Sequence, residues 1–240
     1  MMKIGFFGAG KMAHGILAAI PNRRGVIMSD VNHNRNREIA KKCDLIFLAV
    51  RPGDVEAVAA EVKEELHKGQ ILVSIVAGKS LAKLRASFGN KVKIIRVMPN
   101  LCLRAGEGMC VLSSHHPEVE KILQRAGKTL VLAERYFDAV TALSGSGPAY
   151  FAYMEEAMVE GGIKLGLKPA AARLLAEQTM LGTAKFLSES GAKLDEFIAG
   201  VATKGGTTAA GMQKLDRGGV FRNLVAETLE AAATRSKELG

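Results

Sequence analysis

Residues 3–20 read KIGFFGAGKMAHGILAAI, and this stretch decides the fold. A short apolar run leads into the pattern G-x-G-x-x-A and then into apolar residues at helical spacing, which is typical of a dinucleotide-binding strand–turn–helix. In that motif Gly8 allows the tight turn, Gly10 lets the backbone approach a pyrophosphate, and Ala13 lets the helix pack closely on the strand. The free N–H groups at the start of the helix would bind the anion. A glycine turn with a purely structural role is the alternative.

The rest of the first half repeats this alternation of β-rich and helical stretches. Several runs are apolar on both faces, as in the buried strands of a parallel sheet. They are Lys3–Phe7, Val26–Ser29, Leu45–Val50, Ile71–Ile75 and Val92–Val97, and two later runs, Met109–Leu112 and Thr129–Leu132, are candidate edge strands. The alternation predicts an α/β, Rossmann-type doubly wound sheet.

From Asp138 onward the sequence changes to Ala, Leu, Met and Gly at helical spacing. Helices are predicted at 148–165, 169–188, 208–216 and 219–238, with a short turn near 194–199 and breaks at Gly191 and Gly200. We therefore predict two domains, a dinucleotide-binding Rossmann domain at 1–133 and an all-α substrate and dimerisation domain at 134–240. Apolar residues lie on more than one face of these helices, which predicts a homodimer. They are Tyr150, Phe151, Met154, Met158, Leu174, Leu175, Met180 and Leu181.

The composition excludes several classes of protein. Hydrophobic residues make up 48% of the 240 residues, as in a folded globular protein. The net charge is +9, but the 33 Lys and Arg are dispersed and only 5% of residues are aromatic, so we expect no nucleic-acid partner. No apolar stretch is long enough for a membrane span, and Lys11 and His14 interrupt any signal peptide. Three cysteines without a CxxC pair predict a reducing, cytoplasmic location and no metal site.

Two opposing signals follow the second predicted strand. Asp30 lies 20 residues after Gly10, where a carboxylate usually accepts hydrogen bonds from the ribose of NAD. The next residues include Arg35 and Arg37, and guanidinium groups suit the 2′-phosphate of NADP. An exposed basic loop is the alternative for the two arginines.

Three more segments have the composition of ligand sites. Arg96–Asn100 ends a predicted strand, where open α/β sheets bind ligands. Leu143–Ala149 and Thr203–Thr208 each open a helix, and their small residues expose backbone N–H groups that bind carboxylates or phosphates. Thr208 adds a hydroxyl that both donates and accepts hydrogen bonds. A simple helix cap is the alternative for each segment.

Taken together, these segments resemble the pyrroline-5-carboxylate reductase family over nearly the whole chain. The motifs that carry the resemblance are Ile4–Ala13, Phe47–Pro52, Ser74–Gly78, Arg96–Asn100, Leu143–Ala149 and residues 203–216, which read TKGGTTAAGMQKLD. The last motif is the most specific, because it is close to the C-terminal signature of the family.

The resemblance implies reduction of the cyclic imine 1-pyrroline-5-carboxylate to L-proline by NADPH or NADH, the last step of proline biosynthesis. It also implies that the helical half interlocks with that of a partner subunit in a homo-oligomer, a dimer or a pentamer of dimers. With the glycine motif, it assigns the cofactor to Gly8, Ala9, Gly10, Lys11, Met12, Asp30, Asn36, Ala49, Val50, Arg51, Pro52, Val76, Ala77 and Asn100.

The resemblance places the substrate on the loop Gly206–Thr208. We expect the N–H groups of Gly206 and Thr207 to bind the carboxylate, and Thr208, as the catalytic residue, to accept the N–H of the ring nitrogen as hydride arrives. A protonated imine is already electrophilic, so positioning supplies much of the rate and little acid–base apparatus is needed. Glu134 aligns with a carboxylate of the substrate region, although a surface Glu is the alternative.

The chain departs from the family pattern in four places, of which the least important is Met212 at an aliphatic position of the C-terminal signature. About 20 residues are missing after Asp30, which removes an edge helix and strand and part of the adenosine-binding wall, so the choice between NADP and NAD stays open. Leu101 and Cys102 replace the usual Thr-Pro, and Gly200 stands where some members place a cofactor-contacting Asn.

Two other functions stay open at this point. A catalytically silent dinucleotide-binding redox sensor would keep the glycine motif and could lose the loop 205–208, which is intact here. Another imine reductase or a β-hydroxy-acid reductase could share the architecture. The hydroxy-acid enzymes need a Lys as general base on the first helix of the second half, and residues 148–163 contain none.

Overall fold

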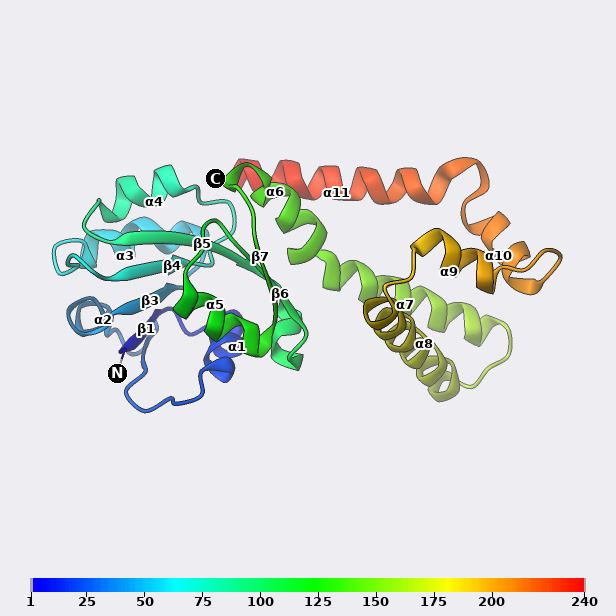
Figure 1. The fold of residues 1–240 in the computed structure, drawn as a ribbon, viewed down its shortest axis with the longest axis horizontal. Helices are drawn as coiled ribbons and strands as arrows, with labels where there is room; N and C mark the ends of the chain where they lie inside the picture. Colours follow the sequence, from blue (N-terminus) through cyan, green and yellow to red (C-terminus); the bar gives the residue numbers. More distant parts are fainter. Residues whose placement is uncertain (1, 240) are drawn as a thin grey trace. The chain divides into compact units, whose positions relative to one another are not determined.

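The computed structural model describes residues 2–239, which form two compact units (Figure 1). The first unit contains residues 2–148 and 229–239, and the second contains residues 149–228. Among the described residues, no helix combines the length and the apolar character needed to cross a bilayer.

The first unit is built on a seven-stranded sheet with the strand order β2-β1-β3-β4-β5-β6-β7. Neighbouring strands are parallel except for β5 and β6, which are antiparallel. The strands are β1 (Ile4–Phe7), β2 (Ile27–Ser29), β3 (Leu45–Leu48), β4 (Ile71–Ser74), β5 (Lys93–Pro99), β6 (Gly108–Leu112) and β7 (Gly127–Val131). All seven predicted strands are present, with ends that differ by at most two residues. Of the two candidate edge strands, β7 is at the edge, but β6 lies inside the sheet between β5 and β7.

Strand β2 forms one edge of the sheet, as the shortened segment after Asp30 predicts. In the doubly wound order, a further strand would lie outside β2. Here the chain passes from β2 into the short helix α2 (Asn36–Lys42) and then directly into β3.

Side chains alternate between the two faces of the sheet and form two separate cores. Phe6, Phe47 and Val73 belong to the core that includes helices α1 (Lys11–Ala19) and α5 (Pro117–Leu123). Phe7, Ile46, Leu48 and Leu72 belong to the core that includes α2, α3 (Val55–Val62) and α4 (Leu81–Phe88). Helices therefore cover both faces, which explains why these strands are apolar throughout.

The remaining helices are α6 (Phe137–Val140), α7 (Gly147–Lys164), α8 (Pro169–Ser190), α9 (Leu194–Val201), α10 (Thr207–Leu215) and α11 (Val220–Leu239). The four helices predicted from the sequence are confirmed. The predicted turn near 194–199 was wrong, because these residues belong to α9. Gly191 does end α8, with φ at +64°, but the predicted break at Gly200 lies inside α9.

The two compact units do not divide at the predicted boundary of 133/134. Residues 134–148 stay with the sheet because Phe137 and Val140 pack on Met98 and Val111. The end of α11 also belongs to this unit, where the buried Ser236 hydroxyl donates a hydrogen bond to Asp138 Oδ1 at 2.7 Å.

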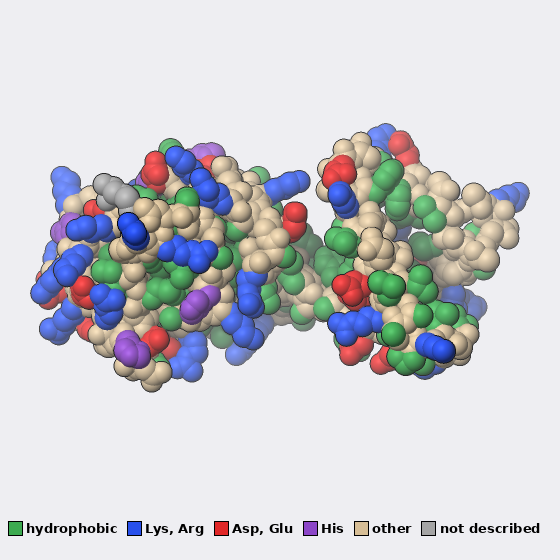
Figure 2. Space-filling view, turned by 90° about the horizontal axis from the view of Figure 1, so that it is seen from below, with side chains coloured by type: hydrophobic (Ala, Val, Ile, Leu, Met, Phe, Trp, Pro, Cys, Tyr) green, Lys and Arg blue, Asp and Glu red, His purple; other side chains and the backbone are tan. Residues whose placement is uncertain are grey.

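The helical unit buries very little of its own apolar surface. Within residues 149–228, only Ala172 and Ala176 are buried hydrophobic residues. Phe151 and Leu174 are 66% and 67% exposed, and Figure 2 shows hydrophobic side chains at the surface of this unit. Exposed apolar area of this extent is typical of a protein–protein interface.

Candidate functional site

The glycine motif forms a tight strand–turn–helix at the end of β1. Gly8 has φ at +102° and its N–H donates to the Ser29 carbonyl at 2.9 Å. A Cβ on Gly8 would lie 2.5 Å from the Ala49 carbonyl oxygen, so no other residue fits. Gly10 caps α1, and a Cβ placed there would meet no atom within 4 Å. Ala13 is fully buried against the strands.

This geometry fits a dinucleotide. Lys11 and Met12 occupy the first two positions of α1, so their N–H groups are among those that have no partner within the helix. Open space over Gly10 lets an anion approach these N–H groups, and the helix dipole favours negative charge there. The residues predicted from the motif therefore combine free N–H groups with open space, which are the two features that a pyrophosphate site requires.

Two more predicted cofactor segments lie at the same edge of the sheet. Ala49–Pro52 follows β3, and Ala49 donates its N–H to the Phe7 carbonyl at 2.7 Å. Val50 is half-buried, Arg51 pairs with Asp54 at 2.9 Å, and Pro52 begins a 3₁₀ turn. The third segment, 75–80, follows β4, and its Val76 N–H lies 3.4 Å from Ser74 Oγ. Since β1, β3 and β4 are parallel, their carboxyl ends meet at one edge.

The loop after β2 holds Asp30 in a fixed orientation. Its Oδ1 accepts the N–H groups of His33 and Asn32, both at 2.8 Å, and these bonds lower the pKa of the Asp30 carboxyl. Arg35 pairs with Glu38 at 2.8 Å, while the exposed Arg37 has no hydrogen-bond or ion-pair partner in the part of the chain that the structure describes. The ionised carboxylate of Asp30 in the loop is thus followed by an unpaired guanidinium, that of Arg37, in the first turn of α2.

Two of the predicted cofactor residues use their side chains to hold the protein together. Asn36 donates from Nδ2 to Glu61 Oε2 of α3 at 2.8 Å. Asn100 accepts the Met109 N–H at Oδ1, at 3.1 Å, and its Nδ2 lies 3.4 Å from Ser144 Oγ. Both residues are about nine-tenths buried. The amide groups that the sequence pattern offers to a ligand are therefore engaged by neighbouring segments.

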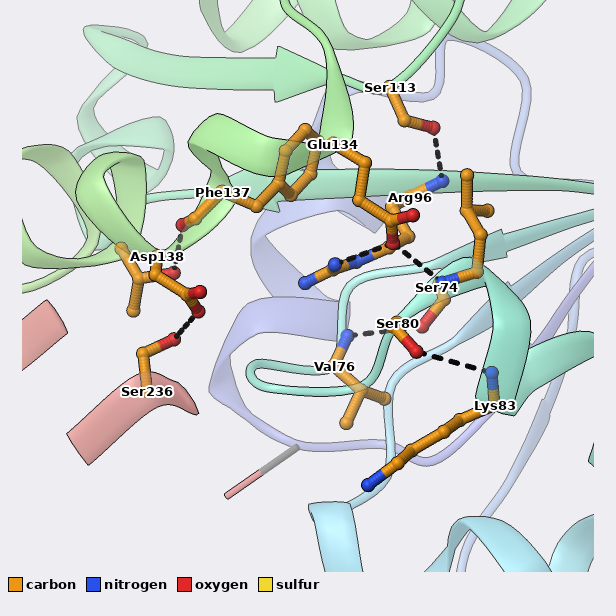
Figure 3. Close-up of polar contacts among 12 residues, drawn as sticks. Ser74, Val76, Ser80, Lys83, Arg96, Ser113, Glu134, Phe137, Asp138 and Ser236 are labelled. Carbon is orange, nitrogen blue, oxygen red and sulfur yellow. Dashed lines mark hydrogen bonds and ion pairs between the residues drawn. The ribbon is translucent and has the colours of Figure 1, made fainter. Parts of the chain in front are cut away.

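Glu134 lies in a polar cluster that the sequence does not reveal (Figure 3). Its Oε1 accepts a hydrogen bond from Arg96 Nη1 at 2.8 Å and another from the Leu81 N–H at 2.6 Å. Arg96 is 5% exposed, and its guanidinium carbon lies 4.6 Å from the centre of the Phe137 ring. Sequence reasoning assigned Glu134 to the substrate; the structure shows one of its oxygens bound to two groups of the first unit.

The predicted substrate loop precedes α10 in the second unit. Gly205 has φ at +75° and Gly206 is the N-cap. The Gly206 N–H donates to the Thr203 carbonyl at 3.0 Å, so it is not free for a carboxylate as the sequence suggested. Thr207 and Thr208 begin the helix, where the N–H groups have no intrahelical partner. Thr208 is therefore not the N-cap, and its hydroxyl has no hydrogen-bond partner among residues 2–239.

Comparisons with known proteins cover the whole chain. Residues 134–239 match the model of a pyrroline-5-carboxylate reductase dimerisation domain, and residues 22–78 match that of a coenzyme F420-dependent NADP oxidoreductase. A pyrroline-5-carboxylate reductase of Arabidopsis thaliana is 37% identical over 267 residues, covering 99% of this chain and 95% of the relative. That aligned span exceeds the 240 residues of this chain, which agrees with the shortened edge of the sheet.

A second relative and a solved structure extend this agreement. A pyrroline-5-carboxylate reductase of Corynebacterium melassecola is 31% identical, covering all of this chain and 99% of the relative. The crystal structure of Plasmodium falciparum pyrroline carboxylate reductase with NADP bound has a TM-score of 0.91 at 30% identity, covering 100% of this chain and 98% of that one. Similarity at this level along its full length shows that the chain belongs to the pyrroline-5-carboxylate reductase family.

Proposed function

We propose that the chain reduces 1-pyrroline-5-carboxylate to L-proline with hydride from a nicotinamide dinucleotide. The observation that carries the proposal is the strand–turn–helix at Gly8–Ala13, with open space over Gly10, in a chain that matches this reductase family along its full length. The intact loop 205–208 supports a catalytic rather than a sensory role.

A dinucleotide bound at the glycine motif would supply a hydride to the carbon of the protonated C=N bond, whose π electrons would pass to nitrogen and give the neutral amine of proline. The chain's own task is to bind and orient the imine. In our proposal, the free N–H groups of Thr207 and Thr208 bind the substrate carboxylate, and Gly206 lets the loop turn into α10. The Thr208 hydroxyl accepts the N–H of the ring nitrogen and fixes the plane of the ring. No charged side chain is required for this step.

We further propose that NADPH is preferred and that NADH is also accepted. The unpaired, exposed guanidinium of Arg37 suits a 2′-phosphate, and one member of the family was crystallised with NADP. The ionised Asp30 opposes this preference, because its charge repels a phosphate and its free oxygen suits a ribose hydroxyl. A measured ratio of kcat/KM for the two cofactors tests this balance.

A homodimer through the helical unit completes the proposal, with a pentamer of dimers as the larger assembly. The match of residues 134–239 to a dimerisation model supports a homo-oligomer, and the exposed apolar side chains of residues 149–228 give the reason. We also propose a cytoplasmic location, since all three cysteines are free.

A steady-state assay tests the function. The purified chain is mixed with 1-pyrroline-5-carboxylate and NADPH or NADH, and both cofactor oxidation and proline formation are measured. We expect stoichiometric proline and no oxidation without the imine. Absence of proline with both cofactors would refute the proposal.

A further inference from the structure

The loop 75–80 is held at each of its ends by contacts within the first unit. At its start, Ser74 Oγ lies 3.4 Å from the Val76 N–H. Near its end, Lys79 pairs with Glu56 of α3 at 2.8 Å, and Ser80 caps α4 by accepting the Lys83 N–H at 3.2 Å. The next N–H, that of Leu81, is the first of α4 and donates to Glu134 Oε1. Figure 3 shows Glu134 reaching this cluster from the segment that leads to Phe137.

Glu134 connects this loop with the middle of the sheet. The oxygen that accepts the Leu81 N–H also accepts Arg96 Nη1, and Arg96 lies level with Ser74 in the pairing of β4 with β5. The Arg96 side chain is only 6% exposed, and a buried charge without a partner is costly in free energy. The ion pair with Glu134 is therefore expected to persist. The Phe137 ring also contacts the guanidinium, with the Arg96 Cζ lying over it 4.6 Å from its centre. The pair therefore holds Glu134 in place, and Glu134 in turn fixes the start of α4.

We infer that Glu134 is a positioning residue for the cofactor, acting through the Leu81 N–H on the loop that precedes α4, and not a substrate contact. The inference rests on the proposed function and on the assignment of Val76 and Ala77 to the dinucleotide, which the family resemblance implies. A carboxylate at a helix N-terminus is favoured by the helix dipole, so loss of its charge weakens the contact even when an oxygen is retained. The loop 75–80 then gains freedom at its α4 end, and we expect this freedom to extend along the loop to the residues at its start, which are assigned to the cofactor.

The test is the dissociation constant for NADPH, measured by fluorescence titration without substrate. We expect Glu134→Gln to raise the dissociation constant for NADPH about three- to tenfold. The change is smaller than the full effect of one hydrogen bond to a charged group, because Gln retains an oxygen that can accept the Leu81 N–H. With NADPH saturating, the KM for 1-pyrroline-5-carboxylate should stay within about twofold of wild type. An unchanged dissociation constant would overturn the inference, and so would a raised substrate KM with normal NADPH binding.

Glu120→Gln is the matched control. Glu120 Oε1 also accepts a backbone N–H at a helix start, that of His116 at 2.8 Å, and it also contacts a basic side chain, His115 at 3.3 Å. These residues follow β6, which runs antiparallel to β5 and therefore ends away from the cofactor loops. We expect Glu120→Gln to lower the melting temperature while NADPH binding stays at the wild-type level. Equal weakening of NADPH binding in both variants would show a general loss of stability and would overturn the inference.

A double variant separates charge pairing from positioning. Arg96→Leu with Glu134→Leu removes both charges, so no unpaired charge is buried and the protein can fold. The Leu81 N–H still lacks its acceptor, and NADPH binding should remain weakened. Recovery of wild-type binding would overturn the inference. If the wild-type protein itself bound no dinucleotide, the proposed function would fail instead, and the two failures are thus distinguishable.

Discussion

Replacement of Thr208 by Val tests the proposed substrate contact most directly. The change keeps the shape of the side chain and removes its hydroxyl. Gly206 is the N-cap of α10 and Thr208 is the second helical residue, so no cap is lost. Both residues are β-branched, and a half-exposed position without a hydrogen-bond partner among residues 2–239 should change stability by no more than about 0.5 kcal/mol.

The effect on catalysis should be much larger. Loss of one positioned contact at an active site costs about 2–4 kcal/mol, which corresponds to a fall in kcat/KM of roughly 30-fold to several hundredfold. NADPH affinity and the melting temperature should stay at wild-type values, and both are measured on the same preparation by fluorescence titration and by thermal unfolding. Thr207→Val is the control, because its side chain is exposed and only its backbone N–H is assigned to the substrate. A stable, fully active Thr208→Val enzyme would remove this hydroxyl from the mechanism.

Four further outcomes are expected. Gly10→Val should leave the fold intact, since a Cβ there meets no protein atom within 4 Å. The same variant should weaken NADPH binding at least about tenfold, or 1.4 kcal/mol, and unchanged titration curves would place the dinucleotide elsewhere. Gly8→Ala should destabilise the protein itself, because the residue has φ at +102° and its Cβ would clash with Ala49, and denaturant unfolding measures the loss. Arg37→Ala should lower the NADPH-to-NADH ratio of kcat/KM, with Arg24→Ala, another exposed arginine, as the control. Sedimentation at micromolar concentration should give a dimer or larger assembly, and a monomeric mass would contradict the role assigned to the exposed helices.

The sheet could be predicted from the sequence because its strands are buried on both faces. Short, continuous apolar runs such as Ile4–Phe7 and Leu45–Leu48 are typical of strands that helices cover on both sides, and the glycine motif fixes the first turn. The boundary of the first unit was harder, since Phe137 and Val140 look like the start of the helical half until their packing on Met98 is known.

The side-chain assignments outside the glycine motif depended on partners far away in the chain. Glu134 binds the Leu81 N–H across 53 residues and Arg96 across 38, and Asn100 contacts Ser144 across 44. No local sequence pattern indicates such pairs. A polar side chain that is hydrogen-bonded within the protein therefore cannot be distinguished in the sequence from one that is free to bind a ligand. The Gly206 N–H is a shorter-range case, because its bond to Thr203 depends on a loop conformation that composition does not specify.

The division of the chain has a consequence for its biosynthesis. Residues 229–239 belong to the first unit, although the ribosome makes them only after the entire helical unit. During translation the nascent first unit therefore lacks the last turns of α11, and Asp138 has no hydrogen bond from Ser236 until the chain is 98 residues longer. Domains usually fold in the order in which they leave the ribosome. Here synthesis of the first unit starts before that of the helical unit but ends after it. A nascent chain stalled before Ser236 should consequently be cut by protease near Asp138 more readily than the finished protein.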